Sequence, residues 1–226
     1  MLDGTLSLIF FGIEFLILIV VIIFNRKHPF FWSIVSLLAL LQLYQLAEFL
    51  ICIGVNENIT GRIAYTIITF LPPLGYFLST RIVGWKFPDY WLGFAAATAF
   101  SIYYLATPES VDLVNCNPFY AVYSWNHTLL YSIYYMGILV YSITFLVVHL
   151  IFRREKVDRK SSIILLIGYL SFLMPMYIMI WVDSYFASTV TSIMCKYALL
   201  LAVTLGVFSF IKPKTIELKL GKKAKE

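Results

Sequence analysis

The sequence has few charged residues: Asp, Glu, Lys and Arg make up 13% of its 226 residues. A soluble domain keeps roughly a quarter of its residues charged. Hydrophobic residues make up 61% of the chain, so the composition indicates an integral membrane protein. The apolar segments occupy nearly all of the chain, and we therefore expect no soluble catalytic or signalling domain within it.

Cysteine and histidine are also scarce, with three of each. Three cysteines exclude a disulfide scaffold and a structural zinc site. We expect His127 and His149 at opposite membrane surfaces, too far apart to bind one metal. The chain lacks the H-E-x-x-H and G-x-S-x-G motifs. We therefore expect no metal and no catalytic residues, and an enzyme is the less favoured class.

The basic residues give a net charge of +5, but they lie in the connections between apolar segments and in the tail. A nucleic-acid-binding protein needs its basic residues on one face of a soluble fold, so we expect the lipid bilayer and not nucleic acid as the partner. The first apolar run contains Glu14 and is followed, not preceded, by Arg26 and Lys27. We therefore read it as a retained helix and not as a signal peptide.

Windows of about 20 residues predict an all-α fold, a single bundle of seven transmembrane helices over residues 1–211. A basic tail, 212–226, follows and is expected to touch anionic lipid headgroups. We place the spans near 6–24, 31–53, 63–83, 90–105, 128–152, 162–182 and 189–211.

The Lys and Arg residues predict the orientation of the bundle, because cytoplasmic connections carry them in excess. One set of connections holds Arg26 and Lys27, then Arg81 and Lys86, and then the basic segment 153–160. The opposite set holds Arg62 alone, against Asp3, Glu57, Glu109, Asp112 and Asp183. We therefore expect a multi-pass protein of the cell membrane with its N-terminus outside and its C-terminus in the cytoplasm.

The long outer connection, 106–127, is rich in aromatic residues. We expect it to fold back over the bundle as a lid or to lie in the interface as an anchor. Cys116 in this loop is a candidate disulfide partner of Cys52, although a free Cys116 is an equal alternative. Asn58 and Asn126 begin outer N-x-Thr sequences, which are either glycosylation sites or chance occurrences.

One polar locus interrupts the second span. Gln42, Gln45, Glu48 and Cys52 fall within roughly a third of the helix circumference. A carboxylate in a membrane helix costs about 2.5 kcal/mol or more and therefore needs a partner or a task. Glu48 is the carboxylate in this span, and its presence there therefore calls for such a partner or task.

Counting residues inward from the outer surface places Glu48 and Lys196 at similar depths, with Glu14 near the centre of the first span. We predict a Glu48–Lys196 ion pair, with Glu14 joining it or staying protonated. In the alternatives, the pair only fixes helix packing, or Lys196 extends outward alone. The candidate ligand or ion-pair residues are Glu48, Lys196, Glu14, Gln45, Gln42, Ser192 and Cys195.

Two motifs resemble those of an uncharacterised family of bacterial seven-helix membrane proteins. That family has a Gln-Gln-x-x-Glu-Gly-x-x-Trp segment and a Ser-x-Trp-Cys segment. This chain has Gln42-x-x-Gln45-x-x-Glu48 and Ser192-Ile-Met-Cys195, with Phe49 in place of the glycine. The resemblance implies a seven-helix bundle and no particular activity.

A lysine in the seventh helix also resembles the microbial rhodopsins, in which such a lysine forms a Schiff base with retinal. The resemblance makes retinal on Lys196 a remote candidate cofactor. However, the span 63–83 contains no Asp or Glu to act as the counter-ion.

Two function classes remain. In the first, an outward-facing site at Glu48, Lys196 and Glu14 binds or transports a small solute or protons. In the second, a receptor or sensor-like module binds an unknown ligand there and signals through a separate cytoplasmic partner or a homo-oligomer.

Overall fold

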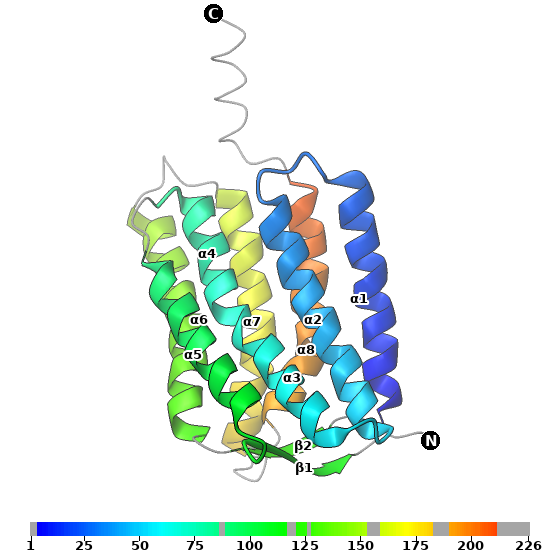
Figure 1. Cartoon of the computed structure of the whole chain (residues 1–226). Helices are drawn as coiled ribbons and strands as arrows, with labels where there is room; N and C mark the ends of the chain where they lie inside the picture. Colours follow the sequence, from blue (N-terminus) through cyan, green and yellow to red (C-terminus); the bar gives the residue numbers. More distant parts are fainter. Residues whose placement is uncertain are drawn as a thin grey trace, which may run out of the picture.

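The computed structural model describes residues 4–85, 89–116, 121–125, 128–152, 159–182 and 190–211. Figure 1 shows the helices packed side by side, with the N-terminus and a small sheet at one end and the C-terminus at the other. The helices are α1 (Thr5–Phe24), α2 (Phe31–Cys52), α3 (Glu57–Thr69), α4 (Leu71–Val83), α5 (Tyr90–Ala106), α6 (Thr128–Phe152), α7 (Arg159–Val182) and α8 (Val190–Ser209).

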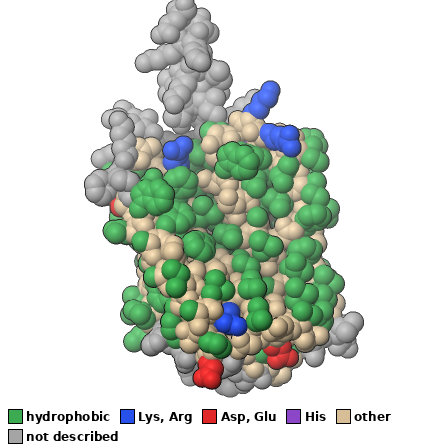
Figure 2. Space-filling model, in the orientation of Figure 1, with side chains coloured by type: hydrophobic (Ala, Val, Ile, Leu, Met, Phe, Trp, Pro, Cys, Tyr) green, Lys and Arg blue, Asp and Glu red, His purple; other side chains and the backbone are tan. Residues whose placement is uncertain are grey.

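Among the residues that the structure describes, four helical segments are long and apolar enough to cross a membrane: Thr5–Phe24, Phe31–Cys52, Glu57–Val83 and Leu129–Phe152. Figure 2 shows hydrophobic side chains over the flank of the bundle. In the same view most Lys and Arg groups lie near the end that carries the C-terminus, and most Asp and Glu groups lie near the other end. A continuous apolar flank of this kind is typical of a membrane protein, since water-exposed surfaces rarely carry one.

The helix that was predicted to begin at Ile63 begins six residues earlier, at Glu57, because Asn56 caps it. The side-chain oxygen of Asn56 accepts a hydrogen bond from the backbone N–H of Ile59, as N-cap residues do. The helix is interrupted at Phe70, so α3 and α4 are consecutive segments of one rod. Pro72 and Pro73 lie in the first turn of α4, where proline is tolerated.

The interruption at Phe70 leaves backbone groups that need new partners. The hydroxyl of Tyr134 in α6 donates to the backbone carbonyl of Thr69 over 2.8 Å. The Thr69 hydroxyl donates to the backbone carbonyl of Tyr65 over 2.7 Å and lies 3.2 Å from the Tyr131 hydroxyl. Tyr134 of α6 therefore supplies a partner for a backbone carbonyl at the interruption.

A β-hairpin covers the end of the bundle near the N-terminus, and the all-α prediction omitted it. Strands β1 (Val111–Cys116) and β2 (Ala121–Trp125) pair antiparallel, with Cys116 opposite Ala121. Their β-branched and aromatic residues favour strands, but an isolated hairpin is marginally stable. It is stabilised here by burial of Val111, Ala121 and Tyr123 against the helices.

A disulfide joins the hairpin to the helical bundle. Cys52, the last residue of α2, is bonded to Cys116, the last residue of β1, with their Cα atoms 5.6 Å apart. A Cα separation of this size is ordinary for disulfides. The bond fixes the covering hairpin to the helix that carries Glu48.

The disulfide predicts how many thiols react with an alkylating reagent. The chain has three cysteines, and two of them are bonded, which leaves one. Protein that is denatured without reductant should gain one alkyl group by mass spectrometry, and three after reduction. A Cys195→Ser variant, the matched control, should gain no alkyl group without reductant and two alkyl groups after reduction. Three labels on unreduced wild-type protein would show that Cys52 and Cys116 are free thiols.

Candidate functional site

Lys196 and Glu48 form an ion pair inside the bundle, close to the hairpin. The ammonium nitrogen Nζ of Lys196 in α8 lies 3.0 Å from Oε2 of Glu48 in α2. The Glu48 side chain is fully buried and that of Lys196 is 12% exposed. The two spans that were predicted to meet here therefore do so, at an atomic distance that allows a charge-assisted hydrogen bond.

The ammonium group of Lys196 has two further acceptors. It donates to Oε1 of Gln45 in α2 over 3.3 Å and to the hydroxyl of Ser7 in α1. A lysine ammonium has three N–H donors, and Glu48, Gln45 and Ser7 together supply three acceptors. Lys196 thus links α8 to both α1 and α2 with no donor left over.

The second oxygen of Glu48 is bound by the hairpin. The backbone N–H of Ala121, the first residue of β2, donates to Oε1 of Glu48 over 3.0 Å. Ala121 is opposite Cys116 in the hairpin, and Cys116 is bonded to α2 one turn beyond Glu48. The hairpin therefore closes the site that was predicted to face outward, and the disulfide secures this cover.

Burial of two charges is favourable only when geometry and hydrogen bonds compensate for their lost hydration. Here each oxygen of Glu48 has a donor, and each donor of Lys196 has an acceptor. All the hydrogen-bonding groups of the ion pair therefore have partners. Removing either residue would leave the other charge buried without compensation.

Glu14, on α1, has no hydrogen bond to this pair. Its side chain is fully buried, and within the described residues neither carboxyl oxygen has a hydrogen-bond partner. Ser7, Glu14 and Val21 are the buried residues of α1, spaced so that they share one face of the helix. Glu14 is thus a second buried acid, two turns along the helix face on which Ser7 bonds to Lys196.

The other predicted site residues are placed differently. Gln42 is buried, but among the described side chains no hydrogen bond joins it to Lys196. Ser192 and Cys195 belong to α8, and their side chains lie outside the described part of the structure. Asn126 also lies outside it, and the Asn58 amide donates to the carbonyl of Pro108.

Sequence reasoning did not find two members of the site, Ser7 and the Ala121 backbone. The only available signal for Ser7 was its spacing from Glu14, since seven residues return to nearly the same helix face. Nothing in the sequence marked the N–H of Ala121, because strand pairing determines where it points.

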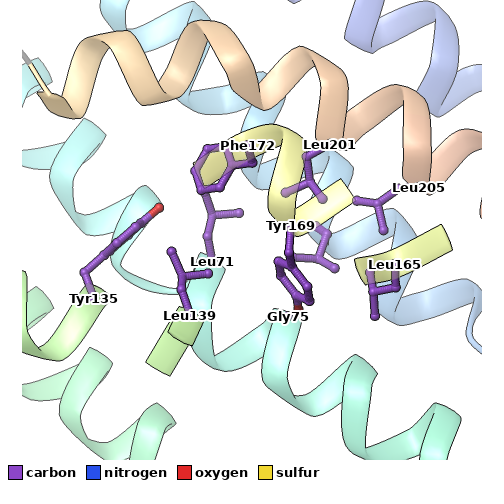
Figure 3. Close-up of a pocket in the computed structure, with 10 residues that line it drawn as sticks. Leu71, Gly75, Tyr135, Leu139, Leu165, Tyr169, Phe172, Leu201 and Leu205 are labelled. Carbon is purple, nitrogen blue, oxygen red and sulfur yellow. The ribbon is translucent and has the colours of Figure 1, made fainter. Parts of the chain in front are cut away.

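A small cavity lies deeper in the bundle, between α2, α4, α6, α7 and α8. It has a volume of about 20 Å³, enough for about one water molecule. Figure 3 shows Tyr135 and Tyr169 among the leucines that surround it. The Tyr169 hydroxyl lies 3.4 Å from the Ser79 hydroxyl. A cavity of this size accommodates water but excludes a larger solute.

The described ranges contain no cluster of three or more His, Cys, Asp or Glu side chains able to hold a metal ion. His149 is buried near the end of α6, where its ring packs on Trp85 with centroids 5.5 Å apart. His127 lies outside the described residues.

These features define a helical membrane protein with a buried, charged polar site. No protein-family model, curated protein sequence or solved structure matches the chain. The function is therefore inferred from the contacts of Glu48 and Lys196 and from the burial of Glu14.

The ion pair predicts non-additive effects on stability. Glu48→Gln and Lys196→Met should each cost about 3 kcal/mol or more, since each leaves a buried charge unpaired. The double variant should be more stable than the sum of the two changes predicts, by about 1 kcal/mol or more. Thermal unfolding in detergent measures all three.

The control cycle combines Lys196→Met with Glu57→Gln, which changes an exposed acid at the start of α3. These two changes should add. Additive effects of the Glu48 and Lys196 substitutions would show that the ion pair does not stabilise the protein.

Proposed function

We propose that the protein crosses the cell membrane seven times, with α3 and α4 forming one span. The N-terminus would be outside and the C-terminus in the cytoplasm. The distribution of Lys and Arg supports this orientation. The Cys52–Cys116 disulfide supports it as well, because disulfides persist on the oxidising side of a membrane.

Within that topology we propose that the protein binds and transports protons. The observation that carries this proposal is Glu14, a fully buried carboxyl group without a hydrogen-bond partner among the described residues. An isolated carboxylate is very costly in a membrane interior, whereas the protonated acid is not. We therefore expect Glu14 to hold a proton. The positive charge of Lys196 would favour the carboxylate that remains when this proton leaves.

The proposed proton exchange involves one ammonium group, that of Lys196, and two acids, Glu14 and Glu48. While Glu14 holds a proton, Lys196 pairs with Glu48, as in the contacts above. When the proton leaves, Glu14 becomes a carboxylate and attracts the same ammonium group. The N–H of Ala121 still donates to Glu48 in that state, so Glu48 keeps one partner. In each state of this exchange, every ionised carboxylate keeps at least one partner, either Lys196 or the N–H of Ala121.

The size of the interior favours a proton over a larger solute as the cargo. The central cavity among the described residues has a volume of about 20 Å³, with space for about one water molecule, and the hairpin covers the ion pair. Water and hydroxyl groups conduct protons through spaces that exclude solutes. Binding of a small solute would require the hairpin to move away from Glu48.

A second candidate, sensing, is favoured by one contact. The hairpin donates a backbone hydrogen bond directly to Glu48, so a ligand that displaces the hairpin would disturb α1, α2 and α8 together. Such a sensor would need a separate cytoplasmic partner, for which the basic segments 153–160 and 212–226 are the candidate contacts. Residues 153–158 and 212–226 lie outside the described part of the chain.

Proton flux into lipid vesicles tests the primary proposal. Vesicles containing the purified protein and an internal pH-sensitive dye should acidify when the external pH is lowered, faster than empty vesicles. Glu14→Gln should reduce the rate to that of empty vesicles, because glutamine cannot exchange a proton. Glu57→Gln, the matched change of an exposed acid, should retain the wild-type rate.

A wild-type rate in the Glu14→Gln variant would contradict proton transport through Glu14. No flux in the wild-type protein, together with a cytoplasmic partner recovered on purification, would favour the sensor.

A further inference from the structure

A long groove runs along the flank of the bundle between α5 and α6. Two cavities lie one after the other in it, with volumes of about 430 and 600 Å³. The first is lined by Gly93 and Gly137, and the second begins one turn further along the same helices, at Ala96 and Tyr134. At 1.5 Å per residue the groove follows α5 for about 15 Å or more.

Small residues explain why the groove is open. A Cβ atom added at Gly137 would meet nothing within 4 Å, so this position in α6 faces free space. Gly93 allows α5 to approach α4 instead, because a Cβ there would lie 3.1 Å from Pro73. The second cavity reaches Phe100, whose ring packs on Tyr134 with centroids 5.0 Å apart.

The end of the groove nearer the start of α5 is polar and acidic. Oδ2 of Asp89 accepts a hydrogen bond from the Tyr76 hydroxyl over 2.6 Å. Oδ1 of the same carboxylate is buried and has no hydrogen-bond partner within the described residues. The torsion that turns a carboxylate is broad, so Oδ1 can rotate toward the cavity that Asp89 lines.

Two aromatic rings stand beside this carboxylate. Tyr76 and Tyr141 both line the cavity, and their ring centroids are 5.1 Å apart. A carboxylate and aromatic faces together form the usual recognition site for an ammonium group. No Lys or Arg is among the described residues that line either cavity, so this part of the lining offers a phosphate or sulfate group no counter-charge.

We propose that this groove binds a single-chain amphiphilic cation from the membrane. Its ammonium group pairs with Asp89 beside the exposed Tyr141 ring, and its hydrocarbon chain lies between α5 and α6, past Gly137 toward Phe100. The charge at one end and the apolar walls beyond it match both parts of such a molecule. This site is separate from Lys196 and does not depend on the proposed proton transport.

Native mass spectrometry with dodecylammonium as the probe tests the proposal. Protein in a non-ionic detergent should retain one dodecylammonium in preference to uncharged dodecanol and anionic dodecyl sulfate. Gly137→Phe should abolish retention by filling the groove, and it should fold, since phenylalanine has a higher helix propensity than glycine and a Cβ atom there meets nothing within 4 Å. Gly12→Phe is the matched control, because a Cβ at Gly12 also meets nothing within 4 Å, and it should bind like wild type.

Asp89→Asn gives a second, independent variant that preserves an acceptor for Tyr76. It should weaken dodecylammonium binding about tenfold or more, because a buried charge loses its partner, and it should leave dodecanol binding unchanged. Equal retention of the three dodecyl compounds would mean that the groove only holds lipid chains, and would overturn the proposal. Wild-type retention by Gly137→Phe, or unweakened binding by Asp89→Asn, would overturn it as well.

Discussion

The contact between the Lys196 ammonium group and the Glu48 carboxylate is the interaction on which this structure depends. It connects α8 to α2, and the Ser7 hydroxyl extends the connection to α1. At membrane depth neither charge is tolerable alone, so each helix constrains the position of the others. The hairpin belongs to the same unit, since Ala121 donates to Glu48 and the disulfide holds the strands in place.

A purely structural ion pair would need one acid, and this site has two. Glu14 is as deeply buried as Glu48, but without a donor among the described residues. That asymmetry distinguishes the two carboxyl groups chemically, because the satisfied one is suited to remain ionised and the isolated one to carry a proton. The case for proton exchange therefore comes from the imbalance of charges and not from the ion pair itself.

Most of the helices and the Glu48–Lys196 contact were predictable, because long apolar runs indicate helices and a fixed rise per residue relates positions on different helices. For example, the predicted span 128–152 coincides with α6. The hairpin was not predicted, since pairing between Val111 and Trp125 depends on contacts that the local sequence does not specify. Ser7 was missed because a lone serine in a membrane helix usually bonds to its own backbone. The groove at Gly137 depends on packing between helices, which periodicity does not reveal.

The central claim is that Lys196 neutralises Glu48 and leaves Glu14 protonated. Infrared spectroscopy tests it directly, because a protonated carboxyl group has a C=O stretch that an ionised carboxylate lacks. At neutral pH the wild-type spectrum should contain a protonated-carboxyl band that Glu14→Gln removes. Lys196→Met should add intensity in that region, since Glu48 would lose its counter-ion. A Glu14→Gln spectrum identical to that of the wild type would contradict the account.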